Sequence, residues 1–222
     1  MTRRGGDYKV ARKQVSQLQT LSCLFWAAVA WSALAPLNPH DYWLEIATPV
    51  LGFVVLAATL KRFRFTPLAY ALLFLEGLVL VVGAHYTHER VPLFDWIKDA
   101  FRLQRNHYDR FAHFCVGLLL VVVVRELLAR TSPLRGRYLA TMSVVSILAL
   151  AGFYEISEWW IAAVTSPETG AAYLGAQGDP WDAQKDMLLD TLGALLGLAV
   201  FTAAHERQLN RGASRESRPL PA

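Results

Sequence analysis

The sequence has few cysteines and little charge, and each shortage excludes a class of protein. Only two of the 222 residues are cysteine, Cys23 and Cys115, and both fall within apolar runs. Two such thiols do not make the disulfide framework of a small secreted domain. Charged residues form 18% of the chain against 54% hydrophobic residues. Because the apolar residues are gathered in long runs, the chain is expected to be a polytopic membrane protein and not a soluble globular one.

The chain also lacks a convincing internal repeat and a low-complexity block, so one compact helical domain is expected. Its net charge of +4 could indicate a nucleic-acid partner. The basic residues, however, lie in short clusters beside the apolar runs, which is the topology signal of a membrane protein. We therefore expect membrane lipids and no nucleic acid as partners, and the sequence leaves the oligomeric state open.

Six apolar runs are long enough to cross a bilayer as helices. They are Leu21–Leu37, Trp43–Leu60, Pro67–Ala84, Asp109–Arg130, Tyr138–Val164 and Pro180–Ala204. The sequence thus predicts an all-α, six-helix transmembrane bundle over residues 21–204. A basic segment over residues 1–20 precedes it, and a polar, disordered tail over residues 205–222 follows it.

Three segments need a separate interpretation. The basic start followed by an apolar run resembles a signal peptide, but Pro36 directly follows the cleavage-like Ala33–Ala35 and should obstruct cleavage. We therefore interpret the first run as an uncleaved span. Phe94–Phe101 has apolar residues at helical spacing, which predicts a short helix on the membrane surface. Residues 165–178 contain Gly and Pro and are interpreted as a loop.

Charge sorting predicts the orientation. If the N-terminus is cytoplasmic, 16 of the 22 Lys and Arg residues fall on the inner side. On the same assignment, 14 of the 18 acidic residues are outer or lie within spans. The positive-inside rule therefore favours six spans with both termini in the cytoplasm.

The outer thirds of three predicted helices repeat one plan, in which acidic residues or histidine are followed by glycine one or more turns deeper. The spacings of three and four residues place these side chains on one face of each helix, and glycine lets helices approach closely. The polar residues are Asp109 and His113 on the fourth helix, Glu155 and Glu158 on the fifth, and Asp182, Asp186 and Asp190 on the sixth; the glycines are Gly117, Gly152, Gly193 and Gly197.

A shared polar cavity open to the outer face explains this plan. An aspartate at a helix centre costs roughly 2.5–3.5 kcal/mol on insertion scales, so these groups are expected to face each other, water or an ion. Carboxylates and imidazoles can hold Mg²⁺, Mn²⁺ or Zn²⁺. They can instead act as a general acid and base, or relay protons and bind a cationic cargo. The sequence leaves these three chemistries open.

Each candidate residue also has a structural alternative. The predicted reactive site comprises Asp109, His113, Glu155, Glu158, Asp186 and Asp190, with Asp109, His113, Glu158 and Asp186 as candidate metal ligands. Arg105, Arg110 and Asp182 at its mouth are candidate substrate-binding residues, because paired arginines suit a phosphate or carboxylate; salt bridges with local acids are the alternative.

Asp179 is interpreted mainly as a helix cap before Pro180. Glu76 either joins the site or bonds a neighbouring helix, and His85 and His88 have ligand-like spacing.

Three motifs resemble those of the YjdF-like bacterial inner-membrane proteins. They are Asn106–His113, Tyr154–Trp160 and Gln177–Asp190. More loosely, the Asp–His helix, the glutamate-bearing helix and the Asp-to-Gly last helix are similar to the VanZ-like family, which is linked to glycopeptide-antibiotic resistance. The resemblance implies a location in the bacterial plasma membrane and the same site residues, and it implies no particular activity.

These observations lead to one main hypothesis and two alternatives. The main one is an outer-leaflet site that binds, and hydrolyses or transfers, a polar group on an envelope lipid or lipid-linked precursor, with a divalent metal as candidate cofactor. The first alternative is a proton- or cation-coupled transporter of a small solute. It predicts acids through to the cytoplasmic face, whereas the inner halves are apolar apart from Glu76. The second alternative is a structural or regulatory membrane partner.

Overall fold

The computed structural model describes residues 4–216 and, within them, the side chains of residues 15–167, 170, 171 and 173–211. This part of the chain holds eight helices and no strand, which confirms the all-α prediction. The helices are α1 (Arg4–Ser32), α2 (Pro39–Thr59), α3 (Pro67–Tyr86), α4 (Pro92–Phe101), α5 (Tyr108–Thr131), α6 (Gly136–Val164), α7 (Pro167–Leu174) and α8 (Asp182–Glu216).

Five of the described helices are long and apolar enough to cross a membrane. They are α2, α3, α5, α6 and α8 as far as Arg211, and they coincide with five of the six predicted spans. The first predicted span, Leu21–Leu37, begins in α1, which is not among the five. The helix ends at Ser32, before the predicted span does, because Ala35 adopts φ 53° and Pro36 follows it. That α1 is a further span, and the side of the membrane on which the termini lie, stay predictions.

Proline and polar side chains define where several helices begin. Proline is the first residue of α2, α3, α4 and α7, where its missing N–H costs nothing and its fixed φ suits a helix. The Asn38 side chain accepts from the backbone N–H of His40 at 3.0 Å, and the Thr66 hydroxyl accepts from that of Ala69 at 3.3 Å. These caps satisfy N–H groups that have no partner within the helix.

The structure corrects three predicted boundaries. Residues 165–178 are not a simple loop, because α7 occupies Pro167–Leu174. The last helix begins at Asp182 and not at Pro180. The disordered tail predicted from residue 205 is wrong for residues 205–216, since α8 continues to Glu216 with His205 fully buried. Predictions for residues 1–3 and 217–222 lie outside the described residues.

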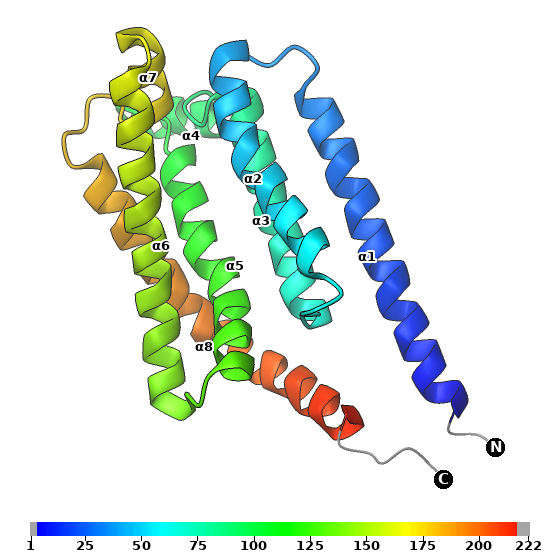
Figure 1. The fold of residues 1–222 in the computed structure, drawn as a ribbon. Helices are drawn as coiled ribbons and strands as arrows, with labels where there is room; N and C mark the ends of the chain where they lie inside the picture. Colours follow the sequence, from blue (N-terminus) through cyan, green and yellow to red (C-terminus); the bar gives the residue numbers. More distant parts are fainter. Residues whose placement is uncertain (1–3, 217–222) are drawn as a thin grey trace.

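The helices lie side by side, with the two short ones across one end of the bundle (Figure 1). The short helices α4 and α7 are at that end, and the start of α1 and the end of α8 are at the other (Figure 1). The predicted helix Phe94–Phe101 is therefore confirmed as part of α4. The ends of α5 and α8 that carry the acids point towards the α4–α7 end.

The close approach of α5 and α8 organises the centre of the bundle. A Cβ added at Gly117 would lie 1.8 Å from the backbone oxygen of Asp190, and one at Gly193 would lie 2.2 Å from that of Phe114. Only glycine permits such contact between helix backbones. Gly152 differs, because a Cβ there would meet only Met187 Sδ at 3.6 Å. The prediction of tight glycine packing thus holds between α5 and α8 and fails at Gly152.

An apolar cluster fills the bundle on the side of this crossing away from α4 and α7. Its buried members include Leu72 of α3, Val122 of α5, Ile147 of α6 and Ala194 of α8. Burial of this kind contributes about 25 cal/mol per Å² of apolar surface. The cluster holds four helices together and leaves their polar residues near the α4–α7 end facing one another.

Candidate functional site

His113 lies at the centre of the polar side chains. Its Nδ1 is 3.0 Å from Asp190 Oδ2, and its Nε2 is 3.9 Å from Asp109 Oδ1 and 3.7 Å from Glu155 Oε1. The first distance is a hydrogen bond and the other two are too long for one. If Nδ1 donates to Asp190, the neutral ring presents the Nε2 lone pair to Asp109 and Glu155. The site thus leaves space for a further group between three helices.

Asp186 approaches the same space from α8. One donor atom each of Asp109, His113 and Asp186 lies within 4.8 Å of the other two. Asp186 is only 2% exposed, and its Oδ1 has no hydrogen-bond partner, as is also true of Asp190 Oδ1 and Glu155 Oε1. A buried polar atom without a partner costs about 1–3 kcal/mol. Three such atoms around one histidine indicate a site that a bound group completes.

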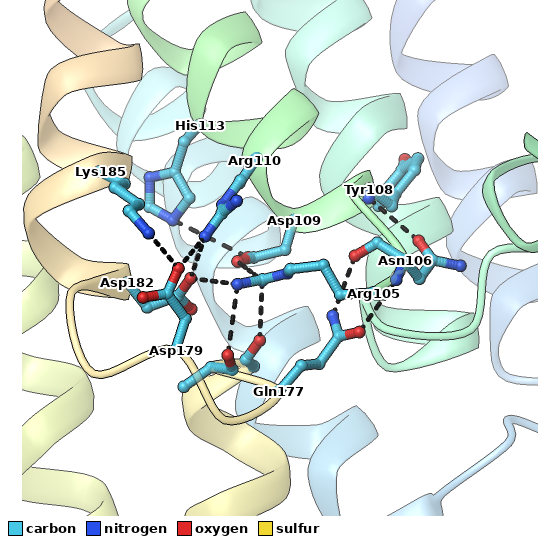
Figure 2. A network of polar contacts seen from close by, with 12 residues as sticks. Arg105, Asn106, Tyr108, Asp109, Arg110, His113, Gln177, Asp179, Asp182 and Lys185 are labelled. Atoms are coloured by element: carbon cyan, nitrogen blue, oxygen red, sulfur yellow. Dashed lines mark hydrogen bonds and ion pairs between the residues drawn. The ribbon is translucent and has the colours of Figure 1, made fainter. Parts of the chain in front are cut away.

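Ion pairs close the mouth of the site, as Figure 2 shows. Arg105 pairs with Asp182, lies 3.5 Å from Asp109, and donates to the backbone oxygens of Gly175 and Ala176. Arg110 pairs with Asp179 and Asp182. The three predicted substrate-binding residues, Arg105, Arg110 and Asp182, are therefore bonded to one another. A substrate anion would have to compete with the aspartates for these arginines.

The segments that precede α5 and α8 are bonded to each other beside these ion pairs (Figure 2). The backbone N–H of Asn106 donates to Gln177 Oε1 at 3.0 Å, and Gln177 Nε2 donates to the Asn106 backbone oxygen at 2.9 Å. Asp179 accepts from Lys185 and from the backbone N–H of Trp181, and these bonds hold the pKa of its carboxyl well below the usual range. The predicted cap is wrong, because α8 begins at Asp182 and the bond from the Trp181 N–H to Asp179 closes a turn before the helix. These bonds fix the loop before α8 to the start of α5.

A cavity of about 280 Å³ opens beside His113. Asp109, His113 and Asp190 lie on its wall together with Glu76 and Glu158. Side chains such as Leu80, Val116, Leu120, Leu150 and Phe153 supply its apolar part. Both carboxylate oxygens of Glu76 are buried without a hydrogen-bond partner. The cavity therefore combines an acidic end with an apolar wall inside the bundle.

Two further residues on this wall, Glu45 and His88, form an ion pair of their own. His88 Nδ1 is 2.6 Å from Glu45 Oε2. Burial lowers the pKa of His88, but the adjacent Glu45 carboxylate outweighs burial and raises it above the ordinary value. Sequence reasoning missed Glu45, although an acid inside an apolar run was a usable signal. The possible ligand role of His88 stays a prediction, with Glu45 as its partner.

The structure brings together most, but not all, of the predicted site. Asp109, His113, Glu155, Asp186 and Asp190 converge. Glu158 lies on the cavity wall and is not one of the three residues whose donor atoms meet. His85 lies away from this group, because its Nδ1 is 2.9 Å from the Ser32 backbone oxygen and its ring packs on Trp31.

A second buried polar network lies towards the end of the bundle away from α4 and α7, and sequence reasoning missed it. Glu126 accepts from the backbone N–H and hydroxyl of Thr66 and lies 3.1 Å from His205 Nε2, and all three side chains are buried. Arg125 Nη1 is 3.1 Å from His205 Nδ1. Charges at this end of a span are expected from topology alone, so their pattern gave no signal. The network joins the start of α3, the last part of α5 and the section of α8 around His205.

Comparison with known proteins agrees with the membrane assignment. Residues 17–207 match the family described as "Predicted membrane protein (DUF2238)". The inner membrane protein YjdF of Escherichia coli (strain K12) is 40% identical over 179 residues, which cover 79% of this chain and 85% of that protein. No solved structure matches the chain significantly. These matches confirm the resemblance to YjdF-like proteins, and the VanZ-like resemblance stays a prediction.

Proposed function

The chain belongs to the DUF2238 family of predicted membrane proteins, and from its buried acidic site we propose that it hydrolyses the polar group of an envelope lipid or lipid-linked precursor. The protein is an integral multi-pass membrane protein, and the name of its relative places it in the bacterial inner membrane. One observation carries the proposal: unpartnered carboxylate oxygens surround His113 beside a cavity with an apolar wall. That combination fits an amphiphilic substrate.

The proposed reaction uses Glu155 as the proton carrier. Its unpartnered Oε1 lies 3.7 Å from His113 Nε2, so a water molecule placed between them is within reach of both. The water oxygen bonds to the electrophilic carbon or phosphorus of a lipid ester while Glu155 takes one water proton. The ester bond to the leaving oxygen then breaks, and Glu155 passes that proton to it. His113, held by Asp190, and Asp109 and Asp186 orient the polar group.

The proposal includes six spans, with α1 as the sixth and both termini in the cytoplasm. Gln17 of α1 donates to the Pro67 backbone oxygen at the start of α3 at 3.2 Å. Ser32, at the end of α1, is bonded to His85 at the end of α3. Since α1 runs alongside α3 from end to end, it crosses the same thickness. With the basic clusters inside, the acidic site opens to the outer half of the membrane.

The transporter alternative is less well supported. It requires a polar route from the site to the inner end. The apolar cluster around Leu72, Val122 and Ile147 separates the site from the Glu126 network instead. An aqueous route through that cluster would need a large rearrangement of packed side chains.

A lipid-conversion assay tests the proposal. The full-length protein is reconstituted in nanodiscs made from a total bacterial envelope lipid extract, and products are identified by mass spectrometry. We expect one lipid class to lose its polar group with the wild-type protein. Glu155→Gln should reduce the rate by at least about 100-fold, as typical for loss of a general base. His40→Ala, a change of an exposed histidine, should leave the rate unchanged.

Two results would contradict the proposal. One is the absence of any lipid change with well-folded wild-type protein. The other is equal conversion by wild type and Glu155→Gln, which would show that the activity arises elsewhere. A loss of activity that accompanies loss of folding is separated from these by the elution profile of each variant in size-exclusion chromatography.

A further inference from the structure

We infer that Asp109, His113 and Asp186 bind one divalent transition-metal ion, Zn²⁺ or Mn²⁺, in the site described above. The inference deepens the proposed hydrolysis and rests on it for the role of the ion, although the binding itself is measured independently. The three residues come from α5 and α8, and their donor atoms lie within 4.8 Å of one another. Because such metals bind nitrogen and oxygen at about 2.0–2.2 Å, two ligand atoms of one ion lie at most about 4.4 Å apart, and a side-chain adjustment of under ~1 Å brings the three atoms into that range.

The donor set selects the class of ion. It consists of two carboxylates and one imidazole, a mixture that suits Zn²⁺ and Mn²⁺ better than the all-oxygen shell that Ca²⁺ and Mg²⁺ prefer. Three protein ligands leave a further position for water, as in catalytic zinc sites. Glu155, with its free oxygen 3.7 Å from His113 Nε2, would be the group that accepts a proton from such a water.

The arrangement around His113 is an independent indication. A metal-ligating histidine usually donates its second ring N–H to a carboxylate, which fixes its tautomer. Asp190 occupies that position at 3.0 Å from Nδ1 and is fully buried. The two helices approach closely at this point, because a Cβ added at Gly117 would lie 1.8 Å from the Asp190 backbone oxygen, and this packing fixes the turn of α8 that carries the carboxylate. Nε2 is thereby directed towards Asp109 and away from Asp190.

Asp186 supplies the second independent observation. It is 2% exposed, and its Oδ1 has no hydrogen-bond partner. In the described part of the chain no arginine or lysine forms an ion pair with it, although both nearby arginines pair with Asp182. A buried carboxylate without a cation is costly. A divalent ion would compensate the charge of Asp186 and Asp109 together.

The inference is tested by metal binding to the full-length protein in detergent. After chelator treatment and dialysis, the protein is loaded with ZnCl₂ or MnCl₂, freed of excess metal and measured by mass spectrometry of the elements. We expect one equivalent per chain. Asp186→Asn and His113→Ala should abolish this binding, whereas Asp190→Asn should weaken it about 10- to 100-fold, as for other outer partners of a ligand histidine.

A matched control and a spectroscopic readout complete the test. Asp99→Asn changes an exposed aspartate and should keep the full equivalent. Co²⁺ loaded in place of Zn²⁺ should give visible absorption bands in wild type and Asp99→Asn that are absent in Asp186→Asn. Binding below 0.2 equivalents in folded wild type, or equal binding in wild type and Asp186→Asn, would overturn the inference.

The two proposals fail in different ways. If lipid conversion occurs in metal-free protein and no metal binds, the hydrolysis stands and the metal site is wrong. If metal binds through Asp186 and His113 but no lipid changes, the metal site stands and the hydrolysis is wrong.

Discussion

At the scale of single residues, the pair formed by His88 and Glu45 should make stability depend on pH. Since the Glu45 carboxylate raises the pKa of His88 above its ordinary 6.5, the folded state holds this proton more tightly than the unfolded chain. The stabilisation is therefore fully present below about pH 6.5 and is lost as pH rises through the raised pKa. His88→Gln should destabilise the protein by about 1–3 kcal/mol at pH 6 and by less at pH 9.

Thermal unfolding of wild type and His88→Gln in detergent, at steps between pH 6 and pH 9, measures this difference. His40→Gln is the control, because His40 is exposed and should give the same small effect at every pH. A loss of stability in His88→Gln that stays constant over this range would show that His88 stabilises the fold by packing and not by its charge.

Individual site residues were predictable when their position in an apolar run had no local explanation. Asp186 and Asp190 lie beyond the first turn of their helix, so capping could not account for them, and His113 lies one turn after Asp109. The arginines had two possible roles, and only the structure shows that Arg105 and Arg110 bond to Asp182. Which partner a long side chain selects depends on loop geometry that residue spacing does not specify.

At the scale of helices, the α5–α8 crossing should not tolerate a side chain at Gly117. A Cβ there would lie 1.8 Å from the Asp190 backbone oxygen, so Gly117→Ala must push the helices apart. We expect a loss of about 1–3 kcal/mol, typical of overpacking, and a fall of several degrees in the unfolding temperature. The same shift should separate His113 from Asp190 and weaken metal binding.

Gly52→Ala is the matched control for this prediction. Gly52 is also helical, but nothing lies within 4 Å of a Cβ added there. Since alanine is favoured over glycine inside a helix, this variant should be neutral or slightly stabilised. Equal unfolding temperatures for Gly117→Ala and wild type would mean that the crossing is looser than the structure shows.

Helix existence was more predictable than helix ends. The apolar runs identified the cores of α2, α3, α5, α6 and α8, because bilayer thickness determines a minimum length. The extension of α8 beyond Ala204 was not predictable, since it depends on His205 contacting Glu126 about 80 residues away in sequence. Likewise, α7 packs beside α6, and its eight residues are too few to give a clear periodic signal.

At the scale of the whole molecule, composition was sufficient to predict a helical membrane bundle with a polar site at one end. The glycine stripes identified the faces of α5 and α8 that meet, because close backbone approach requires small residues. The cavity beside His113 was not predictable, since it is bounded by residues of five helices and α7 whose relative rotation the sequence does not specify. The membrane orientation stays a prediction, made from the distribution of charge along the sequence.

The orientation of the protein in the membrane therefore needs a separate test. The test depends on whether the two ends of α1 lie on opposite sides of the membrane. Ser16 and Leu37 are both exposed and flank the apolar part of α1. Single cysteines at these positions are made in a chain carrying Cys23→Ser and Cys115→Ala, and a membrane-impermeant thiol reagent is applied to intact and permeabilised cells. If α1 crosses the membrane with a cytoplasmic start, Leu37→Cys reacts in intact cells and Ser16→Cys only after permeabilisation.

Arg135→Cys fixes the reference side in the same experiment. Arg135 is exposed between α5 and α6, within a basic cluster that the positive-inside rule assigns to the cytoplasm. It should react together with Ser16→Cys. Reaction of Arg135→Cys in intact cells, with Leu37→Cys reacting only after permeabilisation, would invert the assignment of α2, α3 and α5 and would move the His113 site to the inner half of the membrane. Reaction of Ser16→Cys and Leu37→Cys under one condition would reduce the bundle to five spans, because a helix with both ends on one side does not cross.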